Sequence, residues 1–339
     1  MVTENHTVSS YFARAHLDNT VRLGGDEQTI LALAGLTREL LREPRTRVSP
    51  QQLATIVRAN WRVGGDELLG LATHRMKVGV FALLAERLIQ CKTLGDALTV
   101  AADFYNLVAE GVSFRLVVDN DQARFRVDLA NPQLDRNSLL VEYLLLVWHR
   151  FPSWLVGQVI PLTEVWFDYA EPDHSEEYRL MFPSHCRYLA SYNALVFDAA
   201  ELNTPVIQTA EDLAAYMSEI PLQWFRKQAF YDTYTAQVIR MLEESASQDE
   251  TSLEFIAEKL HMTSRTLRRK LTVEGNSYQQ LKDNVRRDQA INFLGDPRLT
   301  IAQVGRRVGF MEPAAFTRAF KQWTGVSPGI YRKGLHKNP

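Results

Sequence analysis

Two segments near the C-terminal end repeat one helix–turn–helix pattern, and this repetition constrains the fold more than any other feature. The segments are SLEFIAEKLHMTSRTLRRKL at 252–271 and TIAQVGRRVGFMEPAAFTRAFKQW at 300–323. Each begins with apolar residues at i, i+3, i+4 and i+7, the spacing of one buried helix face. A turn and another short helix should follow. We therefore expect two similar helical units, connected by a helix over 278–294.

Polar residues predict where these helices begin. Thr251 with Glu254, and Thr300 with Gln303, have the spacing of a capping box. Thr263 can cap the second helix of the first unit.

Small residues support the same geometry. Ala257 and Gly305 occupy equivalent places, where the two helices of a unit should touch. Gly309 suits the tight turn of the second unit, and Pro313 suits the opening position of the helix after it.

The second helix of each unit is predicted to have two different faces. Leu267 and Leu271 match Phe316 and Phe320, and these four should point inward. The opposite face predicts major-groove contact, because arginine can donate two hydrogen bonds to guanine. An ordinary solvated basic helix is the alternative, and the duplication argues against it. The predicted DNA contacts are Arg265, Thr266, Arg268, Arg269, Thr317, Arg318 and Lys321.

Charge is unevenly distributed along the chain. The whole sequence has 38 Lys/Arg and 40 Asp/Glu, but residues 251–339 contain 16 basic and 7 acidic residues. The first 250 residues contain 22 and 33. A basic C-terminal part should attract phosphates, whereas the acidic part should have another role. Lys282, Arg286 and Arg287 on the connecting helix fit phosphate contacts or solvated surface equally well.

The C-terminal pattern resembles the AraC/XylS transcriptional regulators over residues 252–333. That family generally reads DNA with both second helices, although some members rely mainly on the first. Pro313, Ala314 and Ala315 stand where polar readers could sit, so the second unit either reads bases or only positions the protein. Matching positions include Ala257, Leu267, Arg269, Gly275, Gly309, Phe310, Phe316, Arg318, Phe320, Lys321, Gly325 and Pro328.

The first 250 residues predict a mixed α/β domain that begins with helices. A hairpin is expected where strands 114–119 and 123–129 alternate in hydrophobicity across Asn120 and Asp121. Further strands are expected at 164–169, 186–189 and 194–197. Helices are expected at 26–42, 50–60, 75–89, 94–108, 135–156, 174–181 and 222–244.

Residues 20–208 resemble the arabinose-binding-type N-terminal domain of one AraC subgroup. The resemblance is carried by 68–108 and 175–206, together with the strand around Trp166. It implies a small-molecule effector that need not be arabinose. Regulators with such domains serve diverse pathways, including amino-acid catabolism, of which ornithine utilisation is one example, and lipid-related responses.

The expected organisation is an α/β effector and dimerisation domain followed by an all-α domain. We place the N-terminal domain at 1–210, a helical connector and linker at 211–250, and the DNA-binding domain at 251–335. Its two helix–turn–helix units cover about 252–273 and 300–324. The polar stretch 245–250 suits a linker. Homodimerisation remains open.

No effector-binding residue can be assigned from the sequence. Arg115, Arg124 and Arg126 could bind a carboxylate on the hairpin. Core packing or a solvated strand edge is the favoured interpretation of these and of four aromatic candidates for a pocket, Tyr105, Tyr143, Trp148 and Trp166.

Several classes of function find no support. No apolar stretch reaches 18 residues and no signal peptide is evident, so a cytoplasmic protein without membrane contact is expected. Cys91 and Cys186 lack metal-ligand spacing, so neither a metal nor a cofactor is expected. Nucleophile elbow, P-loop and GxGxxG patterns are missing.

The leading interpretation is a bacterial, effector-controlled, sequence-specific transcription factor that contacts double-stranded DNA and RNA polymerase. Activation is more typical of the resembled family than repression. A constitutive or architectural DNA-binding protein with a structural N-terminal domain is the alternative. An enzyme fused to a DNA-binding domain is a remote third, since two distant cysteines cannot form a four-thiolate site.

Overall fold

The chain forms two compact units that share the N-terminal residues between them. The structure is a computed structural model that describes residues 6–182, 184–226, 234–245, 251–274 and 276–335. One unit contains Tyr11–Ile30 and Leu53–Phe225, and the other contains Met1–Ser10, Leu31–Gln52 and Arg226–Pro339. Two short N-terminal segments therefore pack with the C-terminal helices, which the sequence did not suggest.

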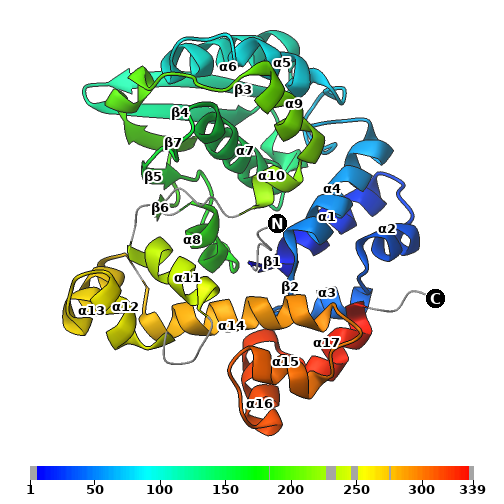
Figure 1. Cartoon of the computed structure of the whole chain (residues 1–339). Helices are drawn as coiled ribbons and strands as arrows, with labels where there is room; N and C mark the ends of the chain where they lie inside the picture. The colour runs from blue at the N-terminus through cyan, green and yellow to red at the C-terminus, as the bar shows by residue number, and fades with distance from the viewer. Residues whose placement is uncertain (1–5, 183, 227–233, 246–250, 275, 336–339) are drawn as a thin grey trace. The chain divides into compact units, whose positions relative to one another are not determined.

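A five-stranded sheet organises the first of these units (Figure 1). The strand order is β3-β4-β7-β5-β6, antiparallel except for the parallel pair β5 and β6. The predicted hairpin is confirmed, with Asn120 in the left-handed conformation at its turn. The strands are β3 Val112–Asp119, β4 Gln122–Leu129, β5 Leu162–Trp166, β6 His185–Arg187 and β7 Asn193–Asp198.

Helices cover the buried face of this sheet. Helix α6 (Leu94–Val108) packs on β3, and α7 (Leu139–Leu155) lies against β4 and β7. Every residue of α7 except Trp154 is buried, which explains its almost continuous apolar sequence. The rings of Phe114 and Phe125 stack on each other at 5.6 Å and contact Trp148 of α7.

Among the other helices of this unit, α5 and η3 contact α6, and α10 contacts α7. Glycine explains one difference from the predicted boundaries: the expected helix 75–89 begins only at Val80, after Gly79 with φ 107°. Helix α1 was not predicted. The remaining elements are α1 Ser10–Arg22, α4 Pro50–Gly64, α5 Val80–Leu88, η1 Pro132–Leu134, η2 Ser175–Glu177, α8 Tyr178–Met181, η3 Ala199–Asn203, α9 Ala210–Glu219 and α10 Leu222–Phe225.

The expectation of one helix over 26–42 is wrong. The segment forms α2 (Glu27–Ala34) and α3 (Arg38–Arg42), separated where Gly35 takes a φ of 62°. Thr37 then caps α3 by accepting a hydrogen bond from the Leu40 amide. The break allows α3 to pack with the C-terminal helices, against α17.

The other compact unit, which contains the C-terminal helices, consists mainly of helices on both sides of α14 (Tyr278–Leu294), the predicted connecting helix (Figure 1). A two-stranded ladder, β1 (Val8–Ser9) with β2 (Arg47–Val48), belongs to the same unit. The other helices are α11 Tyr234–Glu244, α12 Leu253–Lys259, α13 Ser264–Val273, α15 Ile301–Arg307, α16 Pro313–Thr324 and α17 Pro328–Leu335.

Helix α11 is part of the first helix–turn–helix core. Val238 and Leu242 are buried in one cluster with Ile256, Leu267 and Leu281. The expected helix 222–244 is therefore α10 and α11, and residues 227–233 between them lie outside the described residues. The predicted linker 245–250 also lies outside them, apart from Ser245.

The capping residues follow the predictions with one correction. Thr300 and Gln303 form the expected box, and Thr263 caps α13. The first helix, however, is capped by Ser252, whose hydroxyl accepts a hydrogen bond from the Phe255 amide at 3.1 Å. The predicted capping box of Thr251 with Glu254 is therefore wrong, because the N-cap is Ser252.

The predicted small-residue contact between helices is confirmed in both helix–turn–helix units, and the residues that form it differ between them. In the first, Ala257 is buried in the same core cluster as Leu267, where α12 contacts α13. In the second, a Cβ placed on Gly305 would lie 3.0–3.1 Å from three atoms of Phe316. The bulkier aromatic residue on α16 explains why the second unit has glycine where the first has alanine.

We expect Gly305→Val to lower the free energy of unfolding by about 1–3 kcal/mol, because an overpacked core must displace the Phe316 ring. Urea unfolding of the full chain measures this. Gly329→Ala is the control, since its added Cβ would make an ordinary 3.6 Å contact with Ile301. Equal stability of the two variants would contradict the packing argument.

Candidate nucleic-acid interface

Helix α13 presents three arginines on the face opposite its core. Leu267 and Leu271 are fully buried, whereas Arg265, Arg268 and Arg269 are exposed. The predicted polarity of this helix is therefore present in the structure. Predicted contact Thr266 is half-buried, and its hydroxyl lies 3.0 Å from that of Thr263 at the helix N-terminus. Its hydroxyl is thus close to the cap.

The C-terminal end of α13 is fixed to α11. Lys270 donates a hydrogen bond to the Tyr234 hydroxyl at 2.9 Å and lies 4.1 Å from the centre of that ring. The Glu274 carboxylate accepts hydrogen bonds from the amides of Tyr234 and Thr235, at 3.0 and 2.7 Å. These contacts hold the position of α13, and Lys270 is correspondingly half-buried.

Helix α16 presents fewer polar groups. Pro313 occupies the start of the helix, Phe316 and Phe320 are buried, and Arg318 and Lys321 are exposed. The Thr317 hydroxyl donates to the Pro313 carbonyl at 3.0 Å, so its hydrogen atom is already used within the helix.

Apolar surface surrounds the start of α16. Met311, just before the helix, is 81% exposed, and Ala314 is also exposed. Met311 was not predicted as a functional residue, because in the sequence it is only one apolar residue in a turn. The arrangement offers van der Waals contact, for example to thymine methyl groups, rather than hydrogen bonds.

The cations of α14 have contacts inside the protein. Lys282 donates to the Thr251 carbonyl at 2.8 Å, and burial lowers the pKa of its amine. The Arg286 guanidinium lies over the Phe310 ring at 5.4 Å, and Arg287 lies 2.9 Å from Asp288. All three side chains are partly buried, and phosphate contact by them stays a prediction.

The effector candidates of the other unit do not converge on one pocket. Tyr105 and Trp148 pack together in the core at 5.6 Å, whereas Tyr143 contacts Trp224. Trp166 lies on the arginine-bearing side of the sheet, 5.7 Å from the Arg124 guanidinium. The proposed aromatic set is therefore divided between different environments.

The hairpin arginines are also divided. Arg126 makes two hydrogen bonds to Asp128, at 2.6 and 2.8 Å, and Arg124 pairs with Asp119 at 3.1 Å. Arg115 lies instead beside a hollow of about 360 Å³ at the end of α6. No shared carboxylate-binding arrangement results.

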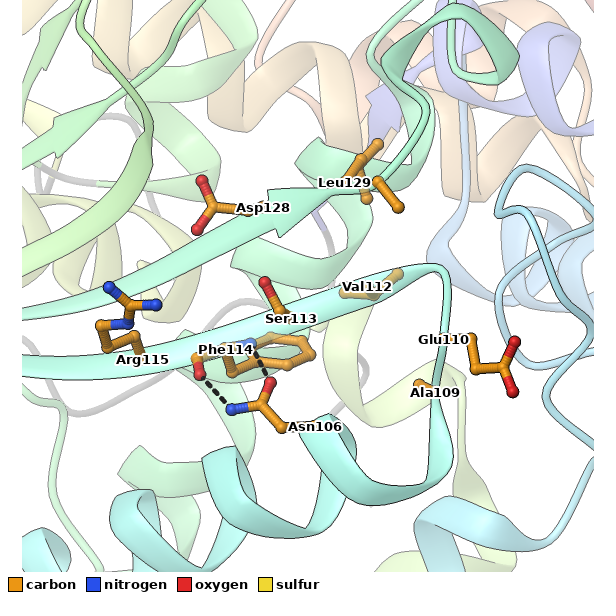
Figure 2. A pocket seen from close by; sticks show the side chains of 10 residues that line it. Asn106, Ala109, Glu110, Val112, Ser113, Phe114, Arg115, Asp128 and Leu129 are labelled. Atoms are coloured by element: carbon orange, nitrogen blue, oxygen red, sulfur yellow. Dashed lines mark hydrogen bonds between the residues drawn. The ribbon is translucent and has the colours of Figure 1, made fainter.

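This hollow is open to solvent and is lined by polar and apolar residues in about equal measure (Figure 2). Arg115 and Asp128 lie on neighbouring strands, and Glu110 lies in the turn between α6 and β3. The Asn106 side chain exchanges two 2.9 Å hydrogen bonds with the Phe114 backbone, which fixes α6 to β3. Effector pockets are usually mainly apolar, so this site does not by itself identify a ligand.

A buried acidic group in α7 was missed from the sequence. Glu142 accepts a hydrogen bond from the Tyr178 hydroxyl, and its Oε1 lies 2.7 Å from His174 Nε2. Burial raises the pKa of Glu142. The His174 ring stacks on Tyr11 at 3.7 Å, so the cluster joins α1, α7 and η2. In the sequence, the only indication of this cluster is the single acidic residue Glu142 within an otherwise apolar stretch.

Within the described parts of the chain, no three His, Cys, Asp or Glu side chains are grouped as metal ligands. The described helices include none with both the length and the apolar character needed to span a membrane.

Comparison with known proteins decides the family. The model for the arabinose-binding domain of AraC transcription regulators matches residues 24–206, and a helix-turn-helix domain model matches residues 256–334. The chain belongs to the AraC family of transcription regulators. It is a DNA-binding regulator with an arabinose-binding-type N-terminal domain.

Relatives of similar length have the same type of name. The ornithine utilization regulator of Pseudomonas aeruginosa is 26% identical over 323 residues, covering 95% of both chains. An uncharacterized HTH-type transcriptional regulator of Mycobacterium tuberculosis is 24% identical over 294 residues, covering 83% of both. The solved structure of transcriptional regulator CdpR from P. aeruginosa is 21% identical, covers 95% of this chain and 98% of that one, and has a TM-score of 0.34.

For this AraC-family regulator, we expect Arg269→Ala to weaken specific DNA binding by about 1–3 kcal/mol and to relax selectivity at one base pair. Arg269→Lys should retain phosphate attraction but lose two-pronged guanine recognition. Selection from a random duplex library, followed by titration, measures both effects. Arg240→Ala, an exposed arginine on α11, is the control. Unchanged selectivity in Arg269→Ala would remove this residue from the interface.

In the second unit, Arg318→Ala should weaken the footprint over the half of the site that α16 contacts. Thr317→Val should have a smaller effect, because the Thr317 hydroxyl donates within its own helix. DNase footprinting of both variants against the unchanged regulator tests this. An unaltered footprint with Arg318→Ala would show that this arginine contributes neither to base reading nor to positioning.

Proposed function

We propose that α13 is the main base-reading element and that Arg265, Arg268 and Arg269 are its principal DNA contacts, with Thr266 near the phosphate backbone. The observation that carries this proposal is the division of α13 into a fully buried leucine side and an exposed arginine side. A cap at Thr263 and the contacts to α11 fix the direction of that exposed side. Such rigid presentation favours specific over diffuse electrostatic binding.

For α16 we propose a supporting role. Arg318 and Lys321 would contact phosphates or one base pair, while Thr317 and the apolar start of the helix contribute shape and methyl contacts. The small number of free hydrogen-bond donors on this helix supports the assignment, since phosphate contacts fix position and base contacts supply sequence selectivity.

Control by a small molecule is the second part of the proposal. We assign the effector to the arabinose-binding-type domain, where the family model and the name of a full-length relative support such a role. The effector would shift the population of DNA-binding states, because a ligand biases only states that it binds unequally. Transcriptional activation through RNA polymerase, in a cytoplasmic protein able to form a homodimer, completes the proposal.

Two other functions compete with this one. A constitutive or architectural DNA-binding protein would use the N-terminal domain only as structure. An enzyme fused to the DNA-binding domain is less favoured, because the relatives described above are named as transcriptional regulators.

A thermal-shift screen of the full chain distinguishes control by an effector from constitutive binding. Amino acids, including ornithine, diamines and sugars form the panel, and an effector at one hundred times its Kd should stabilise the protein by about 2.7 kcal/mol. The same compound should change affinity for DNA fragments isolated with the protein from cells. If compounds change neither quantity while selective DNA binding persists, the constitutive function is correct.

A further inference from the structure

A buried carboxylate on α14 is bound by the N-terminal strand. Asp288 is 9% exposed, and its Oδ2 accepts a hydrogen bond from the Thr7 amide at 3.1 Å. The Thr7 hydroxyl donates to Oδ1 of the same carboxylate at 2.6 Å. Because Thr7 is 2% exposed, water cannot easily replace these bonds. Residues 281 positions apart in the sequence are therefore held in one buried contact within one compact unit.

Two arginines join this polar group, and one of them, Arg287, donates from Nε to Asp288 Oδ1 at 2.9 Å. The Arg47 side chain, 6% exposed, donates from Nε to the Thr7 hydroxyl at 2.7 Å and from Nη2 to the Thr7 carbonyl at 2.8 Å. The ladder of β1 with β2 pairs Val8 with Val48 next to it. Thr7 thus connects a cation on β2 to an anion on α14, and its hydroxyl both donates and accepts.

Strand β2 also contacts α17, the helix that follows the second helix–turn–helix unit. Tyr331 of α17 is fully buried and its hydroxyl donates to the Arg47 carbonyl. Its ring packs on Phe320 of α16 at 5.5 Å. Next to this contact, a Cβ on Gly334 would lie 3.1–3.4 Å from Leu40, which places α3 directly against α17. The N-terminal segments therefore contact both α14 and the helices that carry the second unit.

We propose that Thr7, Arg47 and Asp288 are positioning residues for DNA binding. Together they fix α16 and α17 relative to α14, so the functional DNA-binding body includes residues 6–10 and 31–52 as well as the C-terminal helices. The proposal rests on the assigned roles of α13 and α16. Buried ionic groups gain little net stability but disfavour alternative packings that leave a charge without partners. By disfavouring other packings, the buried polar group would fix the angle between α13 and α16.

Isosteric variants of the full chain test the proposal. Thr7→Val removes only the hydroxyl, and Asp288→Asn removes the charge, so neither changes the packed volume. Thr7→Ser retains the bonds and should behave as the unchanged protein. Asp283→Asn is the matched control, because Asp283 is a less buried aspartate of α14 whose carboxylate accepts a hydrogen bond from Gln279 on the same helix.

Footprinting of Thr7→Val and Asp288→Asn on operator DNA should show unchanged protection of the half of the site that α13 binds. The affinity measured from protection of the half that α16 binds should fall at least tenfold. Adding Arg318→Ala to Asp288→Asn should cause little further loss, whereas adding Arg269→Ala should have its full effect. Unchanged protection of both halves would overturn the proposal. So would an equal loss over both halves, since general destabilisation predicts that result.

Hydrogen exchange of the DNA-free protein separates this inference from the assigned reading roles. Amides of α16 and α17 should exchange at least tenfold faster in Thr7→Val and Asp288→Asn than in Asp283→Asn, with α12 and α13 unaffected. If exchange changes this way but Arg318→Ala leaves the footprint intact, the role of α16 in DNA binding fails while the structural coupling holds. Unaltered exchange in both variants would refute the coupling itself.

Discussion

Helix α14 contributes side chains to two separate cores, and the geometry of the DNA-binding unit depends on that sharing. Leu281 and Val285 are buried with α11, α12 and α13, whereas Ile291 and Leu294 are buried towards the other end, where α14 contacts α15 and α17. A helix with 3.6 residues per turn fixes the rotation between these two sets. A residue inserted within α14 would rotate one core relative to the other by about 100°. The spacing of apolar residues along this helix thus sets the angle between the two units.

The two helix–turn–helix units have the same arrangement of helices, but their second helices expose different numbers of polar side chains. In α13, the exposed side carries three arginines and the last turn is held by Lys270 and Glu274. In α16, larger buried rings require Gly305 on the opposing helix, and the exposed side starts with proline and alanine. The two repeats therefore pack in the same geometry with different residues. Only the first repeat has several hydrogen-bond donors close together on the exposed side of its second helix.

Local signals made the C-terminal helices predictable. Caps at Thr263 and Thr300, together with 3.6-residue periodicity, located their ends because a capping hydrogen bond is made within three residues. The turn of the first unit was less visible, since His261 takes the left-handed conformation with φ 55° where the second unit has Gly309. The break at Gly35 was missed for the opposite reason: glycine is tolerated inside helices often enough that its presence alone does not end one.

Long-range polar contacts could not be predicted from these patterns. Lys282 and Arg286 have the spacing of surface residues, but the Thr251 carbonyl and the Phe310 ring that bind them come from other elements. Asp288 is similar: on a helical wheel it is simply another acid, and its burial depends on Thr7, nearly the whole chain away. With these charged groups turned partly inward, the exposed cations of the C-terminal part include the arginines of α13 and α15, Arg318 and Lys321. Interior packing therefore limits which of the many C-terminal cations are exposed, and net charge alone does not reveal this.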